Sequence, residues 1–310
     1  MKSIFFVILL ASTVVSFGQK KKVCFSIDDL PLVTYGISDS AYQKSLTDKI
    51  IASLKKNNIP AIGFVNEIKL YDKNNIIISW QIKLLNQWVD GGLELGNHTY
   101  SHPDYNALSF EAFSRDVLKG ELVTREIISR KGLSLTYFRH PFLHVGNSKE
   151  KNDSLNIFLS DHGYTIAPVT IDNEDYLFAL AYKRAKDKED FALMKKIGSD
   201  YIDYMESKLK YFEKQAYLLF GREINQILLI HANLLNADYM DSLAKIFLKN
   251  SYEFVTMEEA LEDNAYQTSI TVYGNWGISW MDRWALSQGK KGDFFKGEPI
   301  TPDYIKKLCE

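Results

Sequence analysis

The stretch Val23-Cys24-Phe25-Ser26-Ile27-Asp28-Asp29-Leu30-Pro31 places a short apolar run directly before two adjacent acidic residues. Residues 23–27 are typical of a buried β-strand, because β-branched and aromatic side chains favour strands. Short apolar runs of this kind alternate with longer segments of helical periodicity along the rest of the chain. Because this alternation is typical of βα units around a parallel sheet or barrel, the sequence predicts an α/β fold.

Polar residues follow several of the other predicted strands. These strands are expected at residues 61–65, 93–95, 135–138, 166–171 and 226–230. Helices are expected between them at residues 42–56, 80–89 and 110–129. The strands lead to His98, Arg139, Asp172 and His231. The carboxyl ends of strands in α/β folds form the edge where active sites are built, so these residues are candidates for a site.

Two segments depart from this rhythm. Residues 176–222 are charged and largely helical, and we expect a helical hairpin that either shapes a substrate groove or covers the sheet. Residues 266–310 form a C-terminal extension with three Trp residues, predicted to pack on the same domain. The sequence has no repeat and no Pro-rich linker, which predicts one main domain over residues 19–265.

The chain begins with a basic residue, an apolar run over residues 4–10 and small residues up to Gly18. This pattern predicts a secretory signal peptide over residues 1–18, with cleavage near Gln19. A retained membrane anchor is the alternative, but the apolar run is short for a bilayer and no charged flank follows it. We therefore expect an exported protein, periplasmic or extracellular, without a stable membrane anchor.

The composition limits the partners of the protein. Of 310 residues, 46% are hydrophobic, which is enough to bury a full core. The net charge of −2 argues against nucleic acid as a partner, and the protein is expected to be a monomer. The two cysteines, Cys24 and Cys309, could form one disulfide or remain two free thiols, and the sequence leaves this open.

His98 and His102 stand four residues apart, a spacing at which two imidazoles can converge on one cation. Histidines at the surface or at a helix cap are the alternative for this pair alone. The adjacent Asp28 and Asp29 favour a metal site, because one carboxylate can bind a cation while its neighbour accepts a proton. An Asx turn or a helix cap after the strand is the alternative for the acidic pair.

Five segments, in this order along the chain, resemble the motifs of NodB-type polysaccharide deacetylases, also called carbohydrate esterase family 4. They are residues 26–31, 98–102, 137–142, 172–176 and 228–231. The resemblance implies a distorted (β/α)7-type barrel that carries the helical insertion and the C-terminal extension. The chain departs from the usual motifs at Leu30, Phe142, Tyr176 and Ala232, which puts the identity of the substrate in doubt.

The same resemblance implies a role for individual residues. Asp28 is expected to be the general base and His231 the general acid. Arg139 orients the base, Asp175 is the partner of the acid, and the backbone N–H of Phe142 helps to bind an oxyanion. The expected metal ligands are Asp29, His98 and His102. The metal is expected to be Zn²⁺, with Co²⁺ or Ni²⁺ as alternatives.

Other residues are candidates for binding the substrate. By resemblance, Leu229 contributes to a pocket for the acyl methyl group, and Tyr176 stands where the family has Trp. Trp276 and Trp280 could stack on sugar rings, although Trp side chains are more often part of a core. His140, His144 and Asn233 lie beside the motifs without an assigned role.

The resemblance implies a metal-dependent hydrolase that removes acetyl groups from a carbohydrate. Its substrate would be an N-acetylated glycan, such as peptidoglycan or a chitin-like oligomer, or O-acetylated xylan. Two alternatives stay open: a deacylase of another small acyl substrate, such as a formylated lipid-linked sugar, and a non-catalytic carbohydrate-binding protein. A binding protein needs neither a base nor an acid, so the presence of both favours an enzyme.

Overall fold

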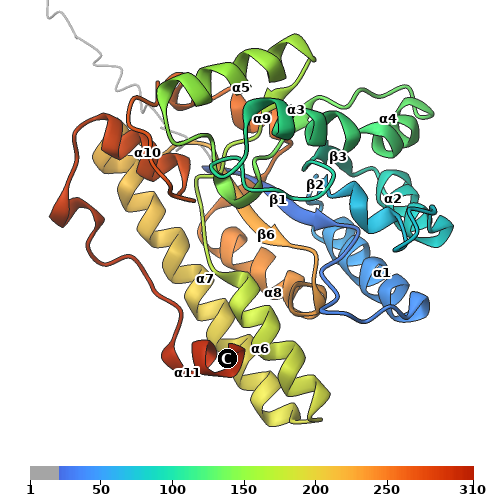
Figure 1. Cartoon of the computed structure of the whole chain (residues 1–310). Helices are drawn as coiled ribbons and strands as arrows, with labels where there is room; N and C mark the ends of the chain where they lie inside the picture. The colour runs from blue at the N-terminus through green and yellow to red at the C-terminus, as the bar shows by residue number, and fades with distance from the viewer. Residues whose placement is uncertain (1–20) are drawn as a thin grey trace, which may run out of the picture.

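The computed structural model of the protein describes residues 21–310 (Figure 1). The signal peptide predicted over residues 1–18 lies outside this range. Within it, seven parallel strands form one sheet in the order β5-β4-β3-β2-β1-β6, and β7 pairs with β1. The strands are β1 (Lys21–Leu30), β2 (Ile62–Val65), β3 (Glu94–Asn97), β4 (Tyr137–Phe138), β5 (Thr165–Ile166), β6 (Gln226–His231) and β7 (Tyr252–Phe254).

The sheet curls towards a barrel. Beyond β5 the chain continues to Ile171, which forms a bridge with Leu228 of β6 and so brings the two ends of the sheet together. The predicted strand over residues 166–171 is therefore only partly correct, because regular pairing ends at Ile166. Pro168 has no backbone N–H to donate to a ladder, which accounts for the interruption. The α/β class and the distorted barrel are confirmed.

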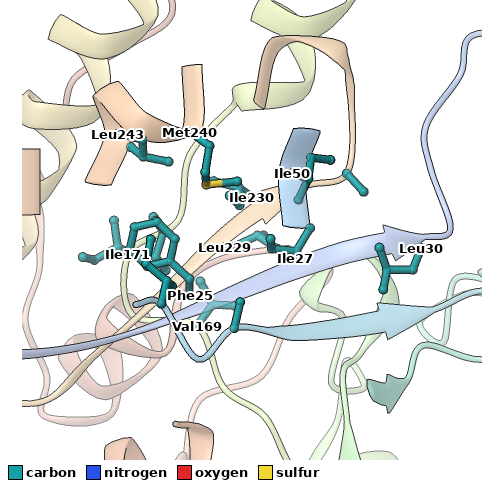
Figure 2. Close-up of a cluster of buried hydrophobic side chains, with 14 of the residues drawn as sticks. Phe25, Ile27, Leu30, Ile50, Val169, Ile171, Leu229, Ile230, Met240 and Leu243 are labelled. Atoms are coloured by element: carbon teal, nitrogen blue, oxygen red, sulfur yellow. The ribbon is translucent and has the colours of Figure 1, made fainter. Parts of the chain in front are cut away.

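Helices cover the sheet. Those that follow the strands are α1 (Ser40–Lys56), α2 (Ser79–Asp90), α3 (Phe110–Lys119), α4 (Leu122–Ser129), α5 (Lys149–Asp161), α8 (Leu234–Lys249) and α9 (Met257–Leu261). Short 3₁₀ turns are η1 (Glu67–Leu70), η2 (Pro141–Leu143), η3 (Asn264–Gln267) and η4 (Gly292–Phe295). Figure 2 shows Phe25 and Ile27 of β1 and Ile230 of β6 packed with Ile50 of α1 and Met240 of α8. The alternate residues Cys24 of β1 and Ile227 of β6 are buried in a separate cluster with Met257 of α9. Because both faces are buried, these strands are continuous apolar runs.

The single helix predicted over residues 110–129 is wrong, because the structure has two helices, α3 and α4. Gly120 ends α3 and lies against the chain at Thr99, where an added Cβ would come within 2.2 Å of the Thr99 carbonyl carbon. Periodicity alone predicts a continuous helix, whereas contact with the loop after β3 requires a break at Gly120.

The charged segment after Asp172 forms two helices, α6 (Asp175–Asp187) and α7 (Phe191–Phe220). Both contact α8, and the Tyr201 hydroxyl donates to Asn236 of α8 at 2.7 Å. The C-terminal extension packs on this pair, with α10 (Trp280–Ser287) against α7 and α11 (Asp303–Cys309) against α6, as Figure 1 shows. The insertion and the extension thus support each other, while the domain boundaries stay predictions.

Both cysteines are free thiols. Cys24 is buried within β1, and the Cys309 Sγ lies 3.2 Å from the Leu177 carbonyl oxygen. The disulfide that the sequence left open is therefore not formed. Within residues 21–310, no helix combines the length and apolar character needed to cross a bilayer.

Candidate active site

A cavity of about 800 Å³ opens at the carboxyl ends of the strands. It is lined by the predicted base, acid and metal ligands and by three other candidates, namely Asp28, Asp29, His98, His102, His231, Phe142, Tyr176 and Leu229. Arg139 and Asp175 are fully buried, each hydrogen-bonded to a residue that lines the cavity. The structure therefore brings together residues that are more than 200 positions apart in the sequence.

A break in the strand pattern of β1 delivers two acids to one cavity. Successive side chains of a regular strand point to opposite faces. The register between β1 and β2 shifts between Ile27 and Leu30, and Asp29 has a φ of 69°. This irregularity, which has the effect of a β-bulge, allows Asp28 and Asp29 to line the same cavity.

Asp29, His98 and His102 form a cluster that fits a metal ion. Their ligand atoms all lie within 4.8 Å of one another, and Asp29 Oδ1 is 3.9 Å from His98 Nε2 and 3.8 Å from His102 Nε2. Two atoms that each lie about 2.0–2.2 Å from one Zn²⁺ can be at most about 4.4 Å apart, and both distances from Asp29 Oδ1 to the histidines lie within this limit. Asp29 Oδ1 is buried without a hydrogen-bond partner within the described chain. A cation would satisfy this oxygen.

The loop after β3 presents both histidines. Thr99 and His102 have positive φ angles, and the Thr99 hydroxyl accepts a hydrogen bond from the His102 N–H at 3.0 Å. Asp116 of α3 accepts from the N–H groups of Tyr100 and Ser101, both at 2.9 Å. His98 and His102, four residues apart, therefore lie in a tight loop and not in a helix. Asp116 of α3 holds this loop in place.

The protonation of the two histidines suits metal binding. The His98 Nδ1 lies 2.8 Å from the Arg139 carbonyl oxygen, so Nδ1 donates and Nε2 is left to face Asp29. Burial lowers the pKa of His98 to about 4 and that of His102 to about 4. Both rings are therefore neutral at pH 7, which is the form that binds metals.

Asp28 lies beside this cluster in a buried ion pair. Both of its carboxylate oxygens are 3.3 Å from Arg139 Nη1, and its Oδ2 is 3.6 Å from His98 Nε2. Burial raises the pKa of Asp28, whereas the Arg139 guanidinium opposes this rise. Arg139 is fixed in turn by the Ala167 carbonyl and the Ser26 hydroxyl, at 2.8 and 2.9 Å. Arg139 thus orients the Asp28 carboxylate, and Asp28 is not one of the three residues of the candidate metal cluster.

His231 approaches from the other strand beside β1. Its Nδ1 is 2.6 Å from Asp175 Oδ1, and its backbone N–H donates to Asp175 Oδ2 at 2.9 Å. The Asn236 amide donates to the same Oδ2 at 2.8 Å. Burial alone would lower the pKa of His231, but the Asp175 carboxylate raises it to about 9. A protonated imidazole next to the cavity can act as a general acid.

Phe142 lies in η2 and has a φ of 55°. Phe142 is the second residue of this 3₁₀ turn. Backbone N–H groups at the start of a helical turn lack an acceptor within the helix. Its ring is half exposed and packs edge-on against the metal-ligand candidate His102, with 4.4 Å between ring centroids. The Tyr176 ring similarly lies edge-on to His231 at 6.3 Å. Aromatic rings therefore flank both the metal ligands and the acid.

The structure does not bring the predicted tryptophans to this cavity. Trp280 is buried beside His140 and lines a second cavity, of about 770 Å³. Trp276 is 41% exposed and lines neither cavity. Trp284 is fully buried in the core. The physical reason is that Trp284 packs edge-on against Phe220 at the end of α7 and Trp280 lies beside His140, so both side chains serve the packing of the extension.

Several polar residues of the site escaped prediction from the sequence. The Lys69 Nζ donates to the Asp29 carbonyl at 2.6 Å and lies 3.8 Å from Asp29 Oδ2. Burial by itself would raise the pKa of Asp29, but Lys69 and the neighbouring histidines hold it below its ordinary value. Lys208, Asp282 and Glu298 also line the cavity. No motif marks these residues, because they reach the site from separate segments.

Comparison with known proteins agrees with the motifs. Residues 17–167 match the family model described as polysaccharide deacetylase, which confirms the predicted resemblance over this segment. The matched segment contains Asp28, Asp29, His98, His102 and Arg139 but ends before Asp175 and His231. A search of the curated proteins finds no match.

Solved structures with a similar fold include a deacetylase, a carbohydrate esterase and a pseudoenzyme. The peptidoglycan deacetylase PdaC from Bacillus subtilis is 22% identical over 78% of this chain and 92% of that chain, with a TM-score of 0.47. A family 4 carbohydrate esterase from Streptomyces lividans in complex with acetate is 17% identical over 77% and 95%, with a TM-score of 0.46. A CE4 family pseudoenzyme from Bacillus anthracis is 17% identical over 78% and 66%, with a TM-score of 0.47.

Proposed function

We propose that the protein is an exported, divalent-metal-dependent hydrolase that removes acetyl groups from a carbohydrate. The observation that carries this proposal is the placement of Asp28 and His231 in one cavity with the three-ligand cluster of Asp29, His98 and His102. Three protein ligands leave a coordination position open, which is the design of a catalytic metal site. Zn²⁺ is the metal that this donor set of two imidazoles and one carboxylate suits best.

Asp28 performs the first proton transfer in this proposal. A bound divalent cation supplies Lewis acidity towards the acyl carbonyl and the attacking water. Asp28 accepts the proton of that water, and Arg139 keeps the carboxylate oriented towards the cavity. The N–H of Phe142 donates to the oxyanion that develops on the carbonyl oxygen.

His231 performs the second proton transfer. Asp175 holds the imidazole through Nδ1, so Nε2 is the nitrogen that gives a proton to the leaving sugar amine or hydroxyl. The raised pKa keeps His231 protonated at neutral pH. Leu229 lines the cavity on the same strand, two residues earlier, and supplies an apolar surface for the acetyl methyl group.

The second candidate is a non-catalytic glycan-binding protein that kept its metal site. The buried pairs Asp28–Arg139 and Asp175–His231 argue against it. Each pair places a charged group in a desolvated position, which binding alone does not require and which costs stability. A hydrolase of another small acyl group, such as formyl, uses the same residues and differs only in the substrate.

An acetate-release panel tests the proposal. Purified protein is incubated with chitin oligomers, peptidoglycan, acetylated xylan and a formylated sugar, with and without chelator and with added Zn²⁺ or Co²⁺. Metal-dependent release of acetate from at least one glycan supports the deacetylase. Release of formate only, from a formylated sugar, would favour the other acyl hydrolase, and binding without release of any acid would favour the glycan-binding protein.

A further inference from the structure

The active-site cavity extends beyond the metal cluster to a second group of charged side chains. We call this group the distal wall, and it consists of Asp172, Glu174, Lys208, Asp282 and Glu298, all of which line the cavity. Lys208 comes from α7, Asp282 from α10, and Glu298 from the segment before α11. The entire wall lies outside residues 17–167, so the family match assigns nothing to it.

The distal wall has more negative than positive charge. Four carboxyl groups face a single ammonium group, and the Lys208 Nζ is already bound to Glu298 Oε1 at 2.5 Å. Asp282 accepts from the Ser279 hydroxyl at 2.7 Å, and Asp172 accepts from the Asn173 N–H at 2.8 Å. Within residues 21–310, no ion pair is formed by Asp172, Glu174 or Asp282. These carboxyl groups therefore have hydrogen-bonding capacity left for a ligand.

Burial outweighs the nearby positive charges of Lys208 and Arg283 at two carboxyl groups of the wall. Burial raises the pKa of Asp172 to about 7, and Lys208 only partly opposes this rise. Burial also raises the pKa of Asp282 to about 6, and the negative charge of Glu298 adds to the effect. A cation placed among these groups would stabilise their ionised forms.

A buried histidine without a partner supports a polar ligand here. His140 is only 1% exposed, lines both this cavity and the second one, and within the described chain has no hydrogen-bond partner on either ring nitrogen. Burial, with Arg283 and Arg139 nearby, lowers its pKa to about 3, so the ring is neutral and offers one donor and one acceptor. An unsatisfied buried ring is costly, and a ligand hydroxyl or amine would remove this cost.

We infer that the distal wall binds a sugar unit with a free amino group, next to the acetylated unit that is hydrolysed. This inference rests on the proposed function and names its substrate class, a partly deacetylated amino-sugar glycan. A sugar ammonium group has donors for the Asp172 and Asp282 carboxylates, and such charge-assisted hydrogen bonds are short and strong. The same wall repels a glycan unit that carries a carboxylate.

Three matched oligosaccharides test the inference with the metal-loaded enzyme. All contain N-acetylglucosamine, and the neighbouring unit is glucosamine, N-acetylglucosamine or a uronic acid. We expect the highest kcat/KM for acetate release with the glucosamine neighbour and the lowest with the uronic acid. Asp282→Asn and Glu298→Gln are expected to reduce kcat/KM about tenfold more for the cationic than for the neutral substrate. The exposed control Glu126→Gln should change neither value.

Equal kcat/KM for the cationic and neutral substrates in the wild type would overturn the inference. So would a preference for the glucosamine neighbour that stays unchanged in both Asp282→Asn and Glu298→Gln. If none of the three substrates releases acetate, the proposed function fails, and calorimetry with a glucosamine oligomer decides the inference alone. Binding that weakens about tenfold in Asp282→Asn and Glu298→Gln supports the distal wall, and unchanged binding refutes it. Two variants are used because Asp282 and Glu298 come from different segments, and in Glu298→Gln the amide oxygen can still accept from the buried Lys208 ammonium group.

Discussion

Asp28 and His231 are register partners on the neighbouring parallel strands β1 and β6, and the N–H after His231, on Ala232, donates to the Asp28 carbonyl at 3.2 Å. The candidate base and the candidate acid therefore stand at the same level of one sheet edge. Their relative position is set by the hydrogen bonds of the sheet, which are more rigid than those of loops. The loop residues His98, His102 and Phe142 complete the site around this fixed pair.

Asp28→Asn is expected to bind metal as well as the wild type does but to lose about 10²- to 10⁴-fold in kcat. Asp28 is not among the three residues of the metal cluster, and an amide of the same shape cannot accept the proton. Metal analysis and acetate release, measured on the same preparation, check this. Undiminished turnover in the variant would exclude Asp28 as the base.

Asp175→Asn is expected to shift the pH dependence of the reaction. The Asp175 carboxylate raises the pKa of His231 to about 9, so a protonated acid is present at neutral pH and is lost as the pH rises through about 9. Removing that charge lowers the pKa, so the alkaline limb of kcat should move to lower pH. A pH profile of both proteins checks this, and an unmoved alkaline limb would contradict the acid role of His231.

Gly120→Ala is expected to weaken metal binding from a distance. A Cβ at this position would come within 2.2 Å of the Thr99 carbonyl carbon and 2.3 Å of the Tyr100 nitrogen, so the loop that carries His98 and His102 must move. Calorimetric titration with Zn²⁺ measures the effect. Gly132→Ala serves as the control, since nothing lies within 4 Å of its added Cβ and its strain stays local. Equal Zn²⁺ affinity in both variants would mean that the loop tolerates the displacement.

Gly277→Ala is expected to lower kcat by about tenfold or more without loss of metal, because oxyanion donors act through precise placement. Gly277 belongs to the C-terminal extension, and a Cβ there would come within 2.2 Å of the Phe142 carbonyl oxygen. The turn that presents the Phe142 N–H would be displaced. Acetate release with metal content as the control measures this, and wild-type kcat would show that the extension does not position the turn.

Much of the central site could be predicted because it is built from short motifs at strand ends. Asp28 follows an apolar strand, and His98 and His102 share one loop, so a few adjacent residues carry the chemistry. The sequence could not show that Asp29 turns into the same cavity as Asp28. That placement depends on the irregular register between β1 and β2.

Other features depend on contacts between distant segments, which periodicity does not encode. The break between α3 and α4 comes from contact of Gly120 with the loop after β3. Lys69 reaches Asp29 from η1, and the distal wall joins the insertion to the extension. Trp280 was expected near the substrate because Trp binds sugars, but the same apolar surface serves the packing of the extension.

Metal analysis of the purified protein, coupled to acetate release, tests whether Asp29, His98 and His102 hold one catalytic cation. We expect one equivalent of divalent metal, loss of acetate release with chelator, and recovery with added Zn²⁺ or Co²⁺. His98→Ala is expected to have neither metal nor activity. Full acetate release from chelated, metal-free protein, or stoichiometric metal and normal activity in His98→Ala, would contradict it.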